Sequence, residues 1–145
     1  MYPYYDYRNM YRQTDKLLRD LTKAINGEYS AVQCYQKIAN MAPSEKERKQ
    51  ILEIREDEIK HLQTFTQIYV NLTGRQPQPQ IIEECPNTYK AGIDFAFIDE
   101  QETVDFYLGV SDEITDVNIK NAFKRAASDE QNHAVWFLYF INKRK

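Results

Sequence analysis

Glu58-Ile-Lys-His61 is a four-residue stretch with a second copy, Glu130-Gln-Asn-His133, 72 positions further along the chain. The chain of 145 residues contains only two histidines, and both belong to these copies. Residues three apart on a helix share a face, so each copy can present a carboxylate and an imidazole to one metal ion. The two copies therefore predict two helices that carry matched metal ligands.

The same offset of 72 relates three further pairs of residues, which indicates an internal repeat. Glu28 and Glu100 each lie 30 residues before the glutamate of a motif, and each is followed seven residues later by a tyrosine. An aspartate directly precedes the glutamate of each motif. The three pairs are Glu28 and Glu100, Tyr35 and Tyr107, and Asp57 and Asp129.

Apolar residues spaced alternately three and four positions apart predict four helices, over about residues 14–41, 44–73, 89–111 and 116–141. The turn residues that a β-protein needs every ten positions or so are missing, because Gly and Pro are scarce. On the predicted helices, the motif residues occupy positions where the pattern requires apolar side chains. Ile54 and Phe65, for example, flank Glu58 and His61 along one face.

Residues 74–88 interrupt the helical pattern and contain three of the prolines. If extended, this segment can reach about 45 Å, whereas a 28-residue helix is about 42 Å long. The segment can therefore travel the length of a helix bundle. We predict an all-α four-helix bundle built from two helical hairpins joined by this long crossover. Residues 1–13 are predicted to be a tyrosine-rich arm, and residues 14–145 the bundle domain.

Six ionisable side chains on the core faces need a partner, because buried carboxylates repel one another and are costly to desolvate. No Lys or Arg falls on the four apolar faces to neutralise them. Two divalent cations would balance four carboxylates, and mixed oxygen and nitrogen ligands suit iron or manganese, with zinc as an alternative. The six residues are Glu28, Glu58, His61, Glu100, Glu130 and His133.

This arrangement over residues 14–141 resembles the ferritin-like di-iron carboxylate family, and most closely its rubrerythrin-like members. In that family two helices each supply one Glu and two others each supply a Glu-x-x-His. The resemblance implies that the six residues bind two iron ions per chain, with Glu58 and Glu130 bridging them. It also implies that Asp57 and Asp129 hydrogen-bond the ligand imidazoles, the alternative being that they are ordinary surface acids.

Tyr35 and Tyr107 lie seven residues after the ligand glutamates, on the same faces. We expect them to pack in the core with each hydroxyl bonded to a carboxylate. The alternative is a catalytic role as a radical or an electron relay.

The resemblance implies redox chemistry: oxidation of Fe(II) by O2 or H2O2 at the paired metals. Two features depart from rubrerythrins. The four cysteines of a rubredoxin-like module are absent, so electrons would come from an external donor protein or from iron. Thr103 stands where rubrerythrins tend to carry an extra Glu, and Glu102 is expected to point elsewhere. A peroxide reductase, an iron-storage protein and a non-catalytic bundle stapled by metal remain alternatives.

The composition of the chain indicates which partners and which cysteine chemistry to expect. The net charge is −3 and charges of both signs are mixed along the sequence, so we expect no nucleic-acid partner. No long apolar run or signal peptide is visible, which predicts a cytoplasmic protein with no membrane partner. Cys34 and Cys85 lie 51 residues apart. We expect no disulfide and no thiolate metal site, with Cys34 as a small buried apolar side chain.

We also expect a homodimer, since two-fold dimers are the commonest soluble oligomers. The N-terminal arm could contribute to the contact. Three aromatic residues off the metal-binding faces could supply an isologous patch: Tyr29, Phe95 and Tyr139.

Overall fold

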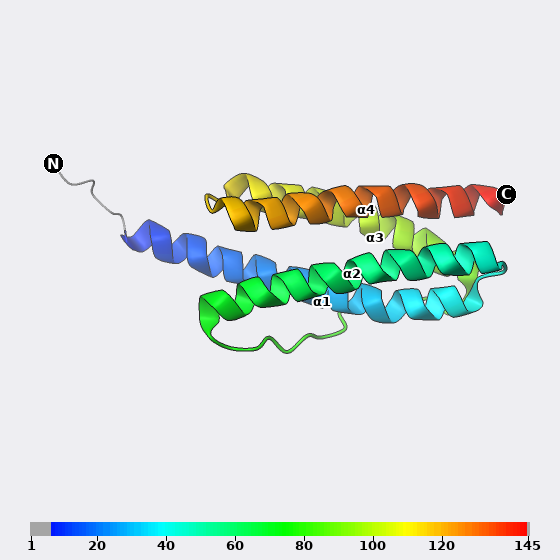
Figure 1. Ribbon diagram of the computed structural model, residues 1–145, viewed down its shortest axis with the longest axis horizontal. Coiled ribbons are helices and arrows are strands. Elements are labelled where there is room, and N and C mark those ends of the chain that lie inside the picture. Colours follow the sequence, from blue (N-terminus) through cyan, green and yellow to red (C-terminus); the bar gives the residue numbers. More distant parts are fainter. Residues whose placement is uncertain (1–6, 145) are drawn as a thin grey trace.

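The computed structural model describes the backbone of residues 7–144 and the side chains of residues 12–144, and over this range the chain is a four-helix bundle (Figure 1). The all-α fold predicted from the sequence is confirmed. The helices are α1 (Tyr7–Met41), α2 (Glu45–Thr73), α3 (Tyr89–Glu113) and α4 (Val117–Lys143). None of the helices in the described range is long and apolar enough to cross a membrane.

Two helical hairpins make up the bundle, α1 with α2 and α3 with α4, and they meet through α1 against α3 and α2 against α4. Side chains cap three helix starts. Ser44, Thr88 and Asp116 each accept a hydrogen bond from a backbone N–H of the first turn of α2, α3 and α4. Gly74 ends α2 with φ of 70°, a left-handed conformation that glycine adopts without strain. These caps leave residues 74–88 as the crossover between the hairpins.

The N-terminal boundary of α1 differs from the sequence prediction. The helix begins at Tyr7 rather than near residue 14. No proline or glycine lies between residues 7 and 26, so nothing in the covalent chain stops the helix earlier. Figure 1 shows the first turns of α1 extending past the ends of the neighbouring helices. Residues 1–6 of the predicted arm lie outside the described residues.

The crossover segment runs along the outer side of α1. The backbone N–H of Gln80 donates to Asn26 (2.9 Å), and that of Ile82 donates to the Ser30 hydroxyl (3.1 Å). Lys37 then donates to the Asn87 side chain (2.6 Å). The segment therefore follows α1 towards its C-terminal end, where α3 begins.

This path corrects one sequence prediction, because Cys34 and Cys85 form a disulfide. The crossover brings their Cα atoms to 5.4 Å, within the range that a disulfide spans. The spacing of 51 residues gave no sign of the bond, since it depends on where the crossover lies against α1. Cys34 is buried, as expected, but it is bonded rather than free.

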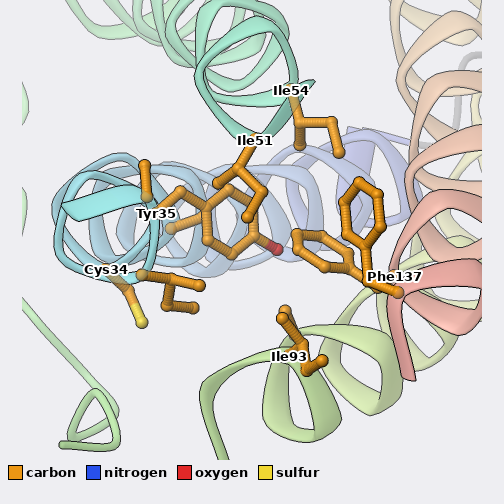
Figure 2. Close-up of a cluster of buried hydrophobic side chains, with 11 residues drawn as sticks. Cys34, Tyr35, Ile51, Ile54, Ile93 and Phe137 are labelled. Carbon is orange, nitrogen blue, oxygen red and sulfur yellow. The ribbon is translucent and has the colours of Figure 1, made fainter. Parts of the chain in front are cut away.

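Two apolar clusters fill the bundle, one on each side of its middle. The first includes Ile38, Ile51 and Phe137, and Figure 2 shows it between α1, α2, α3 and α4. The second includes Leu21, Phe65 and Phe123. The buried polar residues of the two motifs lie between the clusters in sequence and in space. Apolar packing on both sides thus holds the polar layer away from the bundle ends.

Gly92 marks a close approach of α3 to α1. A Cβ atom at this position would lie 2.9 Å from Cγ1 of Ile38, closer than side-chain carbons normally approach. Glycine therefore lets the two helices pack tightly near the start of α3.

Glu47 connects the ends of three helices at one end of the bundle. Its buried carboxylate accepts hydrogen bonds from Ser44 (2.7 Å) and Tyr89 (3.1 Å), and it pairs with Arg144. Burial opposes ionisation, but these hydrogen bonds outweigh it and lower the pKa of Glu47. The carboxylate therefore joins the starts of α2 and α3 to the end of α4.

We expect Glu47→Gln to destabilise the protein by about 1–3 kcal/mol at neutral pH, because Ser44, Tyr89 and Arg144 lose a charged acceptor at this buried position. A lowered folded pKa contributes stability above the ordinary carboxyl value and loses it as pH falls through the folded value. The difference from wild type in urea unfolding should therefore shrink below about pH 4. Glu45→Gln is the control, since its partner Arg48 lies with it at the exposed surface. An equal loss in both variants would contradict the role assigned to Glu47.

Candidate metal centre

The structure brings the six predicted ligands together in the middle of the bundle, in two overlapping groups. Each group offers four ligand atoms, all within 4.8 Å of one another. Glu58 and Glu130 belong to both groups. The first group is Glu28, Glu58, His61 and Glu130, and the second is Glu58, Glu100, Glu130 and His133. Two ions could therefore bind side by side with two carboxylates shared between them.

Each of the six residues carries one buried atom that lacks a hydrogen-bond partner. These atoms are Oε2 of Glu28 and Glu100, Oε1 of Glu58 and Glu130, and Nδ1 of His61 and His133. Buried polar atoms are nearly always satisfied, so six orphans facing one another require an explanation. A pair of cations would supply it, because each of these oxygens and nitrogens can act as a metal ligand.

The other ring nitrogens of the histidines are bonded crosswise between the two halves of the chain. Nε2 of His61, in α2, lies 2.8 Å from Asp129 in α4. Nε2 of His133, in α4, lies 2.9 Å from Asp57 in α2. Each aspartate therefore fixes the imidazole of the opposite motif and leaves its Nδ1 facing the buried carboxylates of the cluster. The arrangement holds α2 and α4 together across the centre.

The two tyrosines are also bonded crosswise. The hydroxyl of Tyr35, in α1, donates to Glu100 in α3 at 2.5 Å, and that of Tyr107, in α3, donates to Glu28 in α1. Both rings are buried. Each hydroxyl donates a hydrogen bond to one oxygen of its carboxylate and leaves the other oxygen free to bind a cation. A relay role for the tyrosines stays a prediction.

The pKa values of the four glutamates show that the metal-free centre cannot hold all its carboxylates in the charged form. Burial, and then the neighbouring Glu58 charge, raise the pKa of Glu28 and of Glu100. Burial, and then the Glu100 charge, raise that of Glu130. Burial also opposes ionisation of Glu58, but the neighbouring imidazoles of His133 and His61, each facing it through Nδ1, lower its pKa. Protons thus take the place of cations when no metal is bound.

The pKa values of the two imidazoles are also raised. Burial opposes a charged ring, yet the carboxylates of Glu28 and Glu58 raise the pKa of His61 to about 11. The carboxylates of Glu100 and Glu58 raise that of His133 to about 12, again against burial. Metal ligands must be deprotonated, so cation binding at this centre has to release protons.

A cavity of about 200 Å³ reaches the centre from the side formed by α1 and α3. Glu28, Glu58 and Glu130 contribute to its inner wall, and Ile82 and Glu83 of the crossover lie at its outer part. The opposite side, between α2 and α4, carries the two imidazole rings with centroids 6.4 Å apart. The centre is therefore approached past carboxylates, with the histidines at the rear.

Several residues of this cavity were missed or misplaced by sequence reasoning. Burial raises the pKa of Asp99, which lines the cavity, to about 7. Asp99 aligns with Gly27 across the repeat, so the repeat gave no signal for it. Thr103 lines the cavity and donates to the Asp99 carbonyl (2.7 Å). Glu102, expected to point elsewhere, also lines it, from an exposed position.

Asp57→Asn and Asp129→Asn are each expected to weaken metal binding about 10–100-fold, the usual cost of losing a carboxylate that orients a ligand histidine. Competitive chelator titration would measure this loss. Asp105→Asn, at an exposed position of α3, is the matched control and should bind like wild type. Unchanged affinity in both test variants would show that the aspartates do not support the ligands.

A family model described as "Ferritin-like domain" matches residues 18–143. The chain is also similar to the uncharacterized protein YhjR of Bacillus subtilis (strain 168), with 54% identity over 143 residues, or 99% of each chain.

Two solved structures share the fold at lower sequence identity. A bacterioferritin from Desulfovibrio desulfuricans, described with its diiron site in different catalytic states, aligns with a TM-score of 0.78 at 21% identity, covering 90% of this chain and 81% of that one. A hypothetical protein from Pyrococcus furiosus aligns with a TM-score of 0.75 at 20% identity, covering 87% and 88%. At such identities these likenesses speak for the fold alone. The ligand cluster here rests on this chain's own residues.

Proposed function

This chain belongs to the ferritin-like domain family, and from that premise we propose that it is a di-iron redox protein in which O2 or H2O2 oxidises Fe(II). The observation that carries the proposal is the set of six orphaned ligand atoms, one from each predicted ligand. Two paired iron ions would supply the electrons for reducing the oxidant.

The residues of the centre suit that task in separate ways. Glu58 and Glu130 belong to both ligand groups, so they would hold two ions close enough to act together. The aspartates fix the imidazoles, and the tyrosines fix Glu28 and Glu100. Glu28, Glu58 and Glu130 line the cavity, through which a small oxidant would enter.

The cavity favours an enzyme over a bundle that metal only staples. A purely structural site is closed, whereas a catalytic site keeps access for its substrate. The space of about 200 Å³ exceeds the share of a few water molecules, about 30 Å³ each in the liquid. O2 or H2O2 fits such a space. A peroxide reductase with an external electron donor would use the same centre and differs only in how electrons return.

We expect anaerobically loaded Fe(II) protein to be oxidised by stoichiometric H2O2 or O2 much faster than free Fe(II) in the same buffer. Stopped-flow absorbance would follow the reaction. The variant Glu58→Ala with His61→Ala should react no faster than free Fe(II). Equal rates for the wild-type protein and free Fe(II) with both oxidants would contradict the proposal and favour the metal-stapled bundle.

Particle size distinguishes the proposed redox protein from an iron-storage protein, which would form a large shell. We propose a small oligomer, a homodimer in its simplest form, and light scattering at the mass of a large shell would overturn this. Tyr139 is 47% exposed on α4, so Tyr139→Asp tests its part in the contact.

A further inference from the structure

The Cys34–Cys85 disulfide lies beside the proposed centre. Cys34 is 6% exposed and lines the same cavity as Glu28, Glu58 and Glu130. Its partner lies in the crossover that passes over this side of the bundle. Figure 2 shows Cys34 and Tyr35 as neighbours on α1, with the tyrosine ring inside the apolar cluster and the Cys34 sulfur at its edge. One end of a disulfide thus lies in the cavity that leads to the proposed metal pair.

A covalent path of one peptide unit leads from Cys34 towards the ligands. The next residue, Tyr35, donates its hydroxyl hydrogen to Glu100 at 2.5 Å. The repeat places Phe106 where Cys34 stands in the first half. The disulfide therefore belongs to the first half of the repeat only, on the side where the cavity opens.

The proposed function leaves one requirement open, because oxidised iron must regain two electrons before a second oxidant molecule can react. No free cysteine exists among the described residues, and the whole chain has only these two cysteines. A dithiol gives up two electrons when it closes to a disulfide, which equals the number that reduction of one H2O2 consumes.

We propose that Cys34 and Cys85 are a built-in two-electron donor that returns the centre to Fe(II) after H2O2 has oxidised it. The inference rests on the proposed function. In the balanced reaction the O–O bond breaks, the two S–H bonds break and one S–S bond forms. The thiols supply two electrons and two protons, and one H2O2 and two thiols become two water molecules and one disulfide. An external thiol reductant would reopen the disulfide for another cycle.

Direct attack of the thiols on peroxide is the competing route. Thiols react as thiolates, and apolar burial disfavours that form. Cys34 belongs to an apolar cluster with Tyr35 and Ile38, so we expect the direct route to be slow. Dependence of thiol oxidation on iron therefore distinguishes the two routes.

The experiment begins with protein that has been reduced, freed of reductant and loaded anaerobically with two Fe(II) per chain. H2O2 is added in steps while free thiols are counted by alkylation and mass spectrometry and iron oxidation is followed by absorbance. After one equivalent, both thiols should be lost and the iron should be Fe(II). Wild type should consume two equivalents before all its iron is oxidised. Cys85→Ser should consume one, a two-fold difference in capacity.

Three controls make the result specific. Metal-free protein and protein loaded with redox-inert Zn(II) should keep both thiols over the same time. Lys37→Met removes a contact between α1 and the crossover but keeps both sulfurs, so it should still consume two equivalents. A capacity of one in Lys37→Met would assign the effect to the position of the crossover and overturn the proposal.

Failure of the inference differs from failure of the proposed function. If peroxide oxidises the iron but both thiols survive, or if wild type and Cys85→Ser have equal capacity, the internal donor is disproved and the di-iron function stands. Thiol loss at the same rate without iron would likewise disprove it. If peroxide leaves the iron reduced in every variant, the proposed function itself fails.

Discussion

Anaerobic titration of the metal-free protein with Fe(II) is expected to end at two irons per chain, and Glu58→Ala with His61→Ala is expected to abolish tight binding. The physical reason is the sharing of Glu58 between both ligand groups. Its removal takes a carboxylate from each ion, and the loss of His61 leaves the first ion with two protein ligands. We expect a loss well beyond the 10–100-fold typical of outer partners.

Glu53→Ala provides the matched control, because Glu53 lies on α2 five residues before Glu58 but is exposed. It should bind two irons like wild type. Equilibrium dialysis with iron analysis gives the stoichiometry, and circular dichroism verifies that the double variant keeps its helices. An endpoint of one iron per chain, or unchanged binding in the double variant, would rule out the paired centre.

Metal binding should also raise the melting temperature by about 10 °C. A ligand that binds only the folded state at about 1,000 times its Kd adds about 4 kcal/mol. For a chain of this size, each kcal/mol corresponds to a shift of about 2–4 °C. Calorimetry with and without Fe(II) or Zn(II) would measure the shift. The variant Glu58→Ala with His61→Ala should show little of it, and an equal shift in that variant would indicate binding elsewhere.

The rise in melting temperature on metal binding should be larger at higher pH. The metal-free centre has a raised pKa at Glu28, Glu100 and Glu130 and at both histidines. Groups with a raised folded pKa contribute stability at low pH and lose it as pH rises through the folded value, because the folded state binds more protons. The metal-free protein should therefore weaken from pH 6 to pH 8. Metal displaces those protons, so its stabilisation should be larger at pH 8.

The six candidate ligands and the four helices could be predicted from the sequence because both depend on local spacing. A glutamate or histidine at an apolar position of a 3.6-residue pattern is costly unless something compensates it. Two copies in register, Glu58 with His61 and Glu130 with His133, made chance an unlikely source. The same spacing predicted hairpins and a crossover over residues 74–88, since prolines there exclude a helix.

The tertiary structure alone decided which residues are partners. The repeat pairs Asp57 with Asp129 but does not say that each bonds the histidine of the other half, which follows from how α2 faces α4. The disulfide and the cavity depend on the path of the crossover along α1. That path is set by contacts between residues some 50 positions apart, such as Ser30 with Ile82. Local periodicity carries no record of such contacts, because they form only once the helices have packed.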